Sequence, residues 1–210
     1  KSLRVCPDPA PYDFCMPGHR YLFKEAIKSA KNSDKPRYPD QYWSEVIAFH
    51  IGRLMGLTLP PVFVAIDSSR NEPGTVSRVL ERGGWLAHDW RQYWGLCLCF
   101  DALIGNTDRH QENWGLIWGE NDPTARYTPY FDNGTSLGHE LQPQKMQRMM
   151  RDHNEFNAYL KRGQHHMRWA KGDKKRLPLI QGVTQYCQQF PAIRPILIER
   201  LQRWCDDDLR

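Results

Sequence analysis

Two polar loops, each framed by apolar segments, constrain the fold of this chain more than any other feature. The first loop runs from Gly105 to Gly115, and the second runs from Phe131 to Ser136. Between them, the apolar segments 114–118 and 127–131 flank the turn-forming residues 119–123, a pattern that predicts a β-hairpin. A hairpin at this place brings the two loops together, so the fold has to present both at one site.

The two loops carry the side chains that phosphoryl transfer requires. Asp108 stands five residues before Asn113, a step that lets both side chains face one cleft, and Asp132 precedes Gly134. An aspartate can accept or orient the proton of an attacking hydroxyl, while carboxylate and amide oxygens are ligands of Mg²⁺. The pattern predicts Asp108 as a catalytic residue and Asn113 and Asp132 as metal and cofactor ligands. Gly134 is expected to give the second loop backbone freedom near the metal.

The alternative is that these residues only form turns, with Asn133-Gly134 as a hairpin turn. Turn chemistry alone does not require Arg109, His110 and Asn113 between apolar segments. His110 either braces the loop backbone beside Asp108, which would make it part of the catalytic loop, or is a structural histidine. No His or Cys partner at ligand spacing supports a metal role for it.

A lysine and a glutamate upstream complete the pattern. The segment 21–26 is aromatic and apolar, which predicts a short strand that carries Lys24. Glu45 lies near the start of a helix predicted over 42–55. An ion pair between them would direct the Lys24 ammonium toward the phosphates of a nucleotide, so both are predicted as cofactor-binding residues. By themselves, two such residues could equally be surface charges.

Hydrophobic periodicity predicts the packed faces of two helices. The stripe of the 42–55 helix is expected to consist of Trp43, Val46, Ile47, His50 or Ile51, and Leu54. A second helix begins near Asp89, and its predicted stripe is Trp90, Tyr93, Trp94, Cys97, Phe100, Leu103 and Ile104. Further strands are predicted over 62–66 and 75–80, with a turn over 67–74 between them, and the clearest late helix is predicted over 191–201.

The loops and the upstream pair resemble segments of the HipA-like kinases, bacterial serine/threonine kinases that are distantly similar to phosphatidylinositol 3- and 4-kinases. The resemblance covers roughly Gly18 to Leu137 and rests on four motifs: Tyr21-Leu22-Phe23-Lys24, Ser44-Glu45-Val46-Ile47-Ala48, Gly105-Asn106-Thr107-Asp108-Arg109-His110-x-x-Asn113-Trp114-Gly115, and Tyr130-Phe131-Asp132-Asn133-Gly134-Thr135-Ser136. It implies that Asp108 is the catalytic aspartate, that Asn113 and Asp132 bind Mg²⁺, and that Lys24 contacts ATP. The chain departs from the family over 11–19, where only Gly18 remains of a Gly/Ser-containing phosphate loop.

The expected fold class is α+β, in a two-lobed protein-kinase-like arrangement. A small strand-rich N-lobe with one helix is expected over 1–82, followed by a hinge at the Gly83-Gly84 connection over 83–88. A larger helical C-lobe over 89–210 then carries the β-hairpin at the active site. With 210 residues, the chain is long enough to bury one substantial core of this kind.

The leading functional hypothesis is an ATP- and Mg²⁺-dependent serine/threonine protein kinase, and as in several relatives it could be the toxin of a toxin–antitoxin pair. Its partners would then be ATP, a protein phosphoacceptor and an antitoxin or other regulatory protein. A second hypothesis is a nucleotide-binding pseudokinase that acts as an interaction module, because the phosphate loop is atypical. A third is a lipid or small-molecule kinase that uses the basic stretch 161–176 to hold an anionic head group.

Charge is distributed unevenly along the chain. The net charge is +5, which is mild for a dedicated nucleic-acid binder, so nucleic acid is expected only as an indirect partner. Basic residues concentrate in the segment 142–176. This excess is either a solvated helical face or a dock for an acidic or phosphate-bearing substrate. His165 and His166 lie in the same polar stretch and are expected to be exposed to solvent.

Cysteine usage and hydropathy bear on the cellular setting. The six cysteines are scattered, and Cys97-x-Cys99 lies in an apolar segment where small buried thiols are expected rather than a zinc site. No apolar stretch approaches the roughly 20 residues that a membrane span requires. The first residues also do not resemble a signal peptide, so a cytoplasmic protein is expected.

Overall fold

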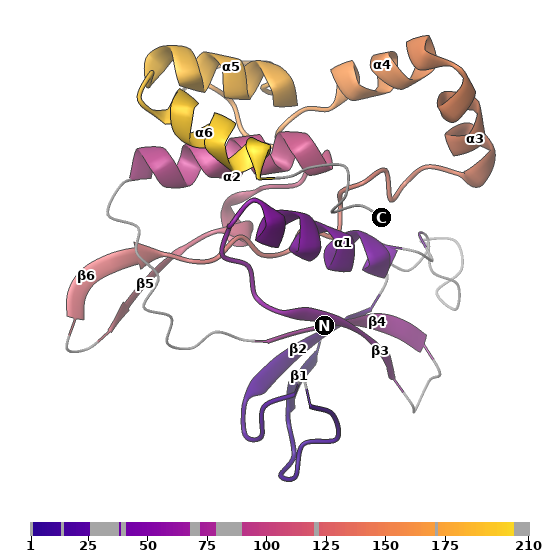
Figure 1. The fold of residues 1–210 in the computed structure, drawn as a ribbon, viewed down its shortest axis with the longest axis vertical. Coiled ribbons are helices and arrows are strands. Elements are labelled where there is room, and N and C mark those ends of the chain that lie inside the picture. The colour runs from indigo at the N-terminus through magenta and orange to yellow at the C-terminus, as the bar shows by residue number, and fades with distance from the viewer. Residues whose placement is uncertain are drawn as a thin grey trace.

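A computed structural model describes residues 2–13, 15–25, 38, 41–67, 72–78, 90–119, 122–170 and 172–203. The first part of the chain forms a four-stranded antiparallel sheet, in which the strand order is β1-β2-β4-β3. These strands are β1 (Ser2–Val5), β2 (Arg20–Glu25), β3 (Val62–Asp67) and β4 (Glu72–Arg78). Helix α1 (Gln41–Leu54) lies beside this sheet, between it and the remaining helices (Figure 1). The fold is thus a mixed one, with a small antiparallel sheet and six α-helices among the described residues.

The sheet confirms the predicted strands and lengthens one of them. Strand β4 begins at Glu72, three residues before the predicted start, and Pro73 pairs with Ile66 of β3. Pairing with β2 on the other side ends at the Glu25–Gly74 pair. Among the described residues, Pro73 has no partner on the β2 side, so its missing N–H breaks no described strand pair and proline is tolerated inside β4. Strand residues occupy positions 67 and 72–74 of the predicted turn, and its remaining residues, 68–71, lie outside the described residues.

Helix α1 is confirmed, but its predicted packing face is only partly right. Ile51 is buried and Val46 packs against the core, whereas Trp43 is 48% exposed and Ile47 is 45% exposed. The buried residues of the helix are Gln41, Ser44, Glu45, Ala48, Phe49, Ile51 and Gly52. A side chain at position 52 would collide with Leu59 and Phe100, so small residues on this face let α1 approach the core closely. The packed face of α1 is therefore the one that lets the helix lie close to the core and turns Glu45 inward. It is not the face with the largest apolar side chains.

Helix α2 (Trp90–Ile104) forms the centre of the main core. Cys97, Phe100 and Ile104 on its predicted stripe are almost completely buried. The prediction was wrong for Trp90 and Leu103, which are exposed near the two ends of the helix. Helices α5 (Leu179–Gln189) and α6 (Ile193–Gln202) pack against it. Cys97 and Cys99 are buried free thiols, as expected, and burial raises the pKa of Cys99 to about 11. Both side chains are packing residues in this core.

The predicted hairpin is present, with its second strand shifted. It consists of β5 (Leu116–Gly119) and β6 (Asp122–Tyr127), so residues 128–131, which were expected to be strand, are irregular. Tyr130 in this stretch is buried, and its hydroxyl donates to the carbonyl of Tyr93, with 2.8 Å between the oxygens. This anchoring to α2 replaces strand pairing and carries the chain to the second polar loop.

Two further helices, α3 (Pro143–Arg151) and α4 (His153–Arg162), extend away from the other helices (Figure 1). The late helix predicted over 191–201 begins instead at Ile193, as α6. The predicted Gly83-Gly84 connection and the hinge over 83–88 lie outside the described residues. No helix in the part of the chain that the structure describes is long and apolar enough to cross a membrane.

Candidate functional site

Arg109 organises the two polar loops from behind. Its side chain is 1% exposed and donates to both carboxylate oxygens of Asp101, over 2.7 Å from Nη2 and 3.1 Å from Nε. It also donates to the carbonyls of Asn113 (3.2 Å) and Phe131 (2.6 Å), and to Oδ1 of Asn133 (2.6 Å). One guanidinium therefore binds a carboxylate of α2 together with backbone and side-chain oxygens of both polar loops.

Electrostatics explain how a charged group can be buried here. Burial acts to lower the pKa of the Arg109 guanidinium, but the adjacent Asp101 carboxylate outweighs it and holds the pKa above its ordinary value. Asp101 is itself fully buried. The sequence contained a signal for this pair, because Asp101 interrupts the apolar stripe of α2, and a buried carboxylate needs a partner. Neither Asp101 nor Arg109 was predicted as a site residue.

Asn106 links the loops at a second point. It is fully buried; its Nδ2 donates to Asp101, and its Oδ1 accepts both from the backbone N–H of Asp108 and from the hydroxyl of Thr135, each over 3.1 Å. The backbone N–H of Leu137 donates to the carbonyl of Ile104 over 2.7 Å. The backbone that carries Asp108 is thus fixed to the segment that follows Asp132.

Lys24, Glu45 and Asp132 meet in front of these loops. The Nζ atom of Lys24 lies 3.3 Å from Oε2 of Glu45 and is also hydrogen-bonded to Oδ1 of Asp132. The other oxygen of Glu45 accepts from the backbone N–H of Asn133 over 2.8 Å. Burial lowers the pKa of Lys24, yet the two carboxylates outweigh it and raise that pKa above its ordinary value. The structure therefore brings together three predicted residues around one ammonium group.

The second loop is tight, but for a different reason than the one predicted. The left-handed backbone conformation belongs to Asp132, with φ 57°, and not to Gly134. A Cβ atom at position 134 would lie 2.8 Å from Oε2 of Glu45 and 3.3 Å from Nζ of Lys24. Gly134 is thus required for space beside the ion pair rather than for backbone freedom.

Asn113 and Asp132 provide oxygen atoms that suit a hard cation. The Nδ2 atom of Asn113 donates to the carbonyl of Asp108 over 2.7 Å, so the Oδ1 atom is the one that remains as a ligand. One amide oxygen and one carboxylate match Mg²⁺, which keeps several waters and binds substrate phosphates. Among the described residues, no group of three or more His, Cys, Asp or Glu side chains could form an all-protein metal cage. The donor set fits a metal that arrives with a nucleotide.

Two histidines near Asp108 differ in what they contact. His110 is the N-cap of a short 3₁₀ helix (Gln111–Asn113), and its Nδ1 accepts from the backbone N–H of Glu112 over 3.2 Å. This contact braces the loop backbone. His139 was not predicted; it is half-buried, and its Nδ1 lies 3.4 Å from Oε2 of Glu140. Burial lowers the pKa of His139, although Glu140 and, more weakly, Asp108 act to raise it. A histidine seven residues after Asp132 gave no periodic signal in the sequence.

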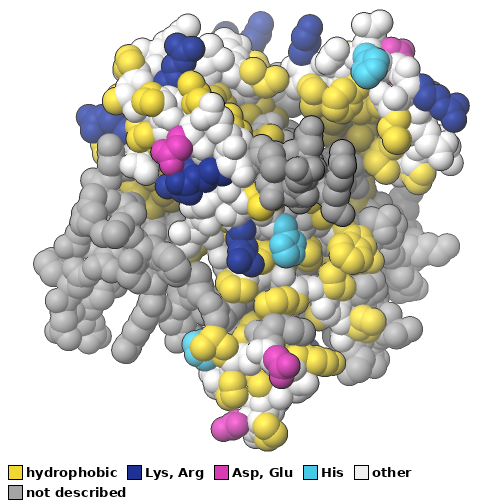
Figure 2. All heavy atoms as spheres, in the orientation of Figure 1, with side chains coloured by type: hydrophobic (Ala, Val, Ile, Leu, Met, Phe, Trp, Pro, Cys, Tyr) yellow, Lys and Arg dark blue, Asp and Glu magenta, His cyan; other side chains and the backbone are white. Residues whose placement is uncertain are grey.

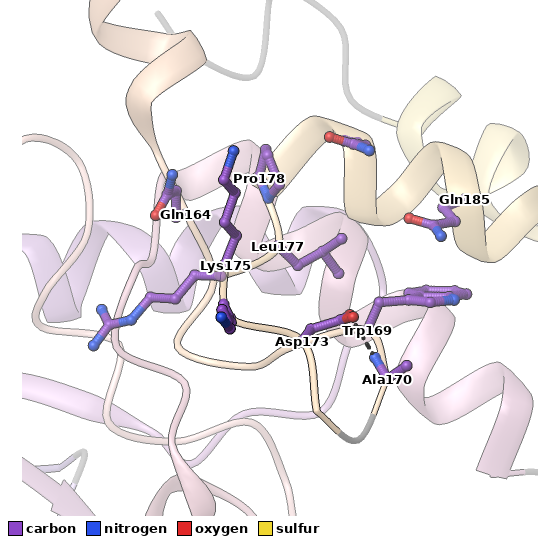
Figure 3. Close-up of a pocket in the computed structure, with 11 residues that line it drawn as sticks. Gln164, Trp169, Ala170, Asp173, Lys175, Leu177, Pro178 and Gln185 are labelled. Carbon is purple, nitrogen blue, oxygen red and sulfur yellow. Dashed lines mark hydrogen bonds between the residues drawn. The ribbon is translucent and has the colours of Figure 1, made fainter.

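The basic stretch 161–176 is divided among separate hollows, and only part of it adjoins this site. Arg168 and Arg176 line a hollow together with His110 and Gln111 of the first polar loop. Lys174, Lys175 and Arg176 lie at a cavity of about 570 Å³ that α5 also lines, and Figure 3 shows Lys175 near Gln164, with Trp169 on the side of Gln185. Both polar loops lie within the described residues, and neither lines this cavity. His166 is exposed as expected, but the prediction for His165 was wrong: it is fully buried beneath Gly182 and Leu177.

Comparison with known proteins gives these contacts a context. The chain is 32% identical over 66 residues to the serine/threonine-protein kinase CtkA of Helicobacter pylori. The matched segment is 31% of this chain and only 20% of that protein. A crystal structure of an H. pylori proinflammatory kinase CtkA superposes with a TM-score of 0.67 at 18% identity, covering 92% of this chain and 74% of that chain. The chain is a homologue of this kinase. No family profile matches it.

These findings confirm the resemblance to HipA-like serine/threonine kinases through CtkA, over a segment of the sequence and in the fold. The shared fold is that of a kinase, with the small antiparallel sheet and the group of helices already described. The roles of individual residues rest on the geometry above and on the chemistry of phosphoryl transfer.

Proposed function

We propose that the chain is an ATP- and Mg²⁺-dependent kinase that transfers the γ-phosphate to a hydroxyl group, with serine or threonine of a protein as the acceptor. The observation that carries this proposal is the contact of Lys24 with both Glu45 and Asp132. A lysine held by a helix glutamate beside a metal-binding aspartate is the arrangement that kinases use for nucleotide phosphates. Homology to a serine/threonine kinase supports the same assignment.

Each side chain has a defined task in this proposal. Lys24 binds phosphate oxygens, and Glu45 orients its ammonium while also fixing the backbone at Asn133. Asn113 and Asp132 hold Mg²⁺, which when bound neutralises charge on the phosphates. Asp108 orients the acceptor hydroxyl and accepts its proton. Arg109 does not touch substrate; it keeps the loops of Asp108 and Asp132 in register.

The proposal includes the two-lobed organisation. Residues 1–82, with the sheet and α1, are assigned to the N-lobe and residues 89–210 to the C-lobe. The hinge is assigned from the sequence to residues 83–88, which lie outside the described residues. Lys24 and Glu45 then belong to one lobe, and Asp108 and Asp132 belong to the other. Because Lys24 bonds directly to Asp132, the cleft between the lobes would close on the nucleotide phosphates at this contact.

Phosphotransfer from radiolabelled ATP tests the assignment directly. The full chain, with MgCl₂ and casein or myelin basic protein as general acceptors, is expected to incorporate label. Asp108→Ala and Asp132→Ala should each reduce incorporation by about 10²- to 10⁴-fold. Glu112→Ala is the matched control, because this carboxylate is exposed on the same loop. Equal incorporation by the wild type and both aspartate variants would overturn the proposal.

A pseudokinase is the second candidate, and the β1–β2 connection favours it. The connection closes on itself, since the backbone N–H of Cys6 donates to the carbonyl of His19 and that of Gly18 donates to the carbonyl of Cys6, each over 2.9 Å. Gly18 is its only glycine. A glycine-rich cover for the phosphates is therefore missing from this segment. ATP binding without transfer to any acceptor would select this candidate.

The proposal extends to a toxin role, in which the antitoxin is a protein partner. Expression of the wild-type chain in a bacterial host is expected to arrest growth, and Asp108→Ala should relieve the arrest. A neighbouring gene for a small helix-turn-helix protein that restores growth on co-expression would identify the partner. Growth arrest that persists with Asp108→Ala would separate toxicity from phosphotransfer.

A further inference from the structure

A large apolar groove lies beside the loop that carries Asp108. Its volume is about 810 Å³. One wall contains Gly105 and Thr107 of the first polar loop, together with Leu137 and Gly138, which follow the second loop. Thr107 is the residue immediately before Asp108. An occupant of this groove would therefore lie next to the proposed catalytic aspartate.

Helices α3 and α4 form the opposite wall of the groove, and each lines it with a stripe of apolar side chains. Each helix presents three apolar side chains at i, i+3 and i+4 spacing; they are Met146, Met149 and Met150 on α3, and Phe156, Tyr159 and Leu160 on α4. Such a stripe normally packs into a core. Here only Met149 is buried, and Met150 is 82% exposed. Figure 2 shows hydrophobic side chains gathered in the upper right region, where α3 and α4 lie in Figure 1.

Polar contacts fix α4 to the segment after the second loop and link α4 to α3, while the apolar side chains of the two helices leave the groove unfilled. The hydroxyl of Tyr159 donates to Glu140 over 2.9 Å, which ties α4 to the segment after the second loop. Arg148 of α3 pairs with Glu155 of α4 at 3.4 Å. Exposed apolar surface of this extent on a folded protein marks a binding site. Methionine side chains are flexible and polarizable, so they can adapt to different apolar partners.

The charged side chains at the groove indicate what kind of partner it binds. Residues 142–163 carry five basic side chains, Lys145, Arg148, Arg151, Lys161 and Arg162, against the acidic side chains Asp152 and Glu155. Lys145 and Arg162 line the groove itself, and one acidic side chain, Glu140, also does so. The rim is therefore positive, which favours a partner with acidic residues. A concave hollow suits a segment of protein that inserts side chains, whereas a membrane surface would need a protruding apolar face.

From these observations we infer that the groove binds a segment of the phosphoacceptor protein that carries apolar side chains flanked by acidic ones. This inference rests on the proposed kinase function, because it makes the groove the site that brings the acceptor hydroxyl to Asp108. The cavity at Lys174 and Lys175 lacks this connection, since the described residues that line it include none from the polar loops. The acceptor is thus recognised by α3 and α4, with Arg162 from the basic stretch, and not by Lys174 and Lys175.

Peptide selection tests the inference in two arms. In the first arm, the full chain without ATP selects binders from a degenerate peptide library with a fixed central serine. In the second arm, the same library is phosphorylated in the presence of ATP and MgCl₂. The wild type is expected to enrich peptides with Leu, Ile, Met or Phe together with Asp or Glu, by about tenfold over the input.

Variants on the groove should change both arms in defined ways. Met150→Glu, at an exposed position that tolerates the change, should lower enrichment by about tenfold. The pair Lys145→Glu with Arg162→Glu should replace the acidic preference by a basic one. Lys174→Glu with Lys175→Glu is the matched control and should leave selection unchanged. Circular dichroism of each variant checks that the fold is retained.

Several results would overturn the inference, and one separates it from the kinase assignment. No enrichment by the wild type, or enrichment that survives Met150→Glu, removes the groove as an acceptor site. Binding to phosphatidylserine vesicles in place of peptides, or self-association in sedimentation velocity that Met150→Glu abolishes, assigns the groove to a membrane surface or a second copy instead. Peptide enrichment in the first arm without phosphorylation in the second leaves the groove supported, while the proposed phosphotransfer fails.

Discussion

The back and the front of the candidate site both contain ion pairs of acidic and basic side chains, but the two sides differ in how far these charges are exposed to solvent. Behind the loops, Asp101 and Arg109 are almost completely buried and their charges are matched by each other and by loop oxygens. In front, Lys24 and Asp132 retain about a fifth of their side-chain exposure. Charges at the back can only hold structure, because nothing can reach them. Charges at the front can exchange their partners for phosphate and metal.

This contrast predicts that variants at the back lose fold and activity together, whereas variants at the front lose activity alone. Both outcomes can be measured on the same proteins by denaturant unfolding and by phosphotransfer.

Arg109→Met should destabilise the fold by about 3–5 kcal/mol, because it leaves the Asp101 carboxylate buried without its partner. Urea unfolding measures the loss, and phosphotransfer should fall with it. The matched control is Arg109→Met combined with Asp101→Asn, which removes both charges and should recover a large part of the stability. An Arg109→Met protein as stable as the wild type would show that the back of the site is not structural.

Asp108→Asn should reduce phosphotransfer by about 10²- to 10⁴-fold while the free energy of unfolding changes by less than about 0.5 kcal/mol. The carboxylate is lost, but the backbone N–H of residue 108 keeps its hydrogen bond to Asn106. Glu112→Gln, on the same loop, should change neither quantity. A parallel loss of stability and activity in Asp108→Asn would erase the distinction between the two sides.

Gly134→Ala should weaken ATP binding by about tenfold, because the new Cβ atom would lie 2.8 Å from Glu45 Oε2 and 3.3 Å from Lys24 Nζ. Isothermal titration with ATP and MgCl₂ measures this change. Gly115→Ala is the control in the first polar loop, where the added atom meets only the methyl group of Thr128 at 3.4 Å. Unchanged affinity in Gly134→Ala would mean that the ion pair does not define the nucleotide site.

The pH dependence of stability should reveal the buried histidine at the back. Burial lowers the pKa of His165, so the unfolded chain binds more protons than the folded chain once the pH falls below about 6.5. The free energy of unfolding should therefore decrease between pH 7.5 and pH 5.5. His165→Leu should flatten this decrease, whereas His50→Gln, on the exposed side of α1, should not. An unchanged slope in His165→Leu would assign the acid sensitivity elsewhere.

Helices α1 and α2 show how far periodicity alone could lead. On α2, most of the predicted stripe is buried, because α5, α6 and Tyr130 pack against this helix. Trp90 and Leu103, which were predicted on the same stripe, are exposed. On α1, the same reasoning selected Trp43 and Ile47, which are exposed. The helix instead turns Ser44, Glu45, Ala48 and Gly52 inward. Periodicity assumes that the largest apolar side chains are buried, and it fails where a charged residue has to face a site.

The sequence predicted that the two polar loops form one site. It did not predict the hydrogen bonds that join them. The residue types and spacing of Asp108, Asn113 and Asp132, with Lys24 and Glu45 upstream, are enough to indicate phosphoryl-transfer chemistry. The bonds of Arg109 to Phe131 and Asn133 join residues 22 and 24 positions apart. Local patterns do not encode such long-range geometry, so Arg109 went unassigned, as did the acidic partner inside α2.

Residue type alone indicates which side chains can carry the chemistry, because it fixes whether a group can bind phosphate, coordinate Mg²⁺ or accept a proton. Sequence patterns also predicted α1, α2, α6 and the strands β2 to β6, but neither β1 nor the individual helices α3, α4 and α5. The three-dimensional fold was needed to show which face of α1 packs, that His165 is buried, and that α3 and α4 leave an apolar groove beside Asp108. These features depend on what each surface meets across the fold, and that is set by packing between segments distant in the chain.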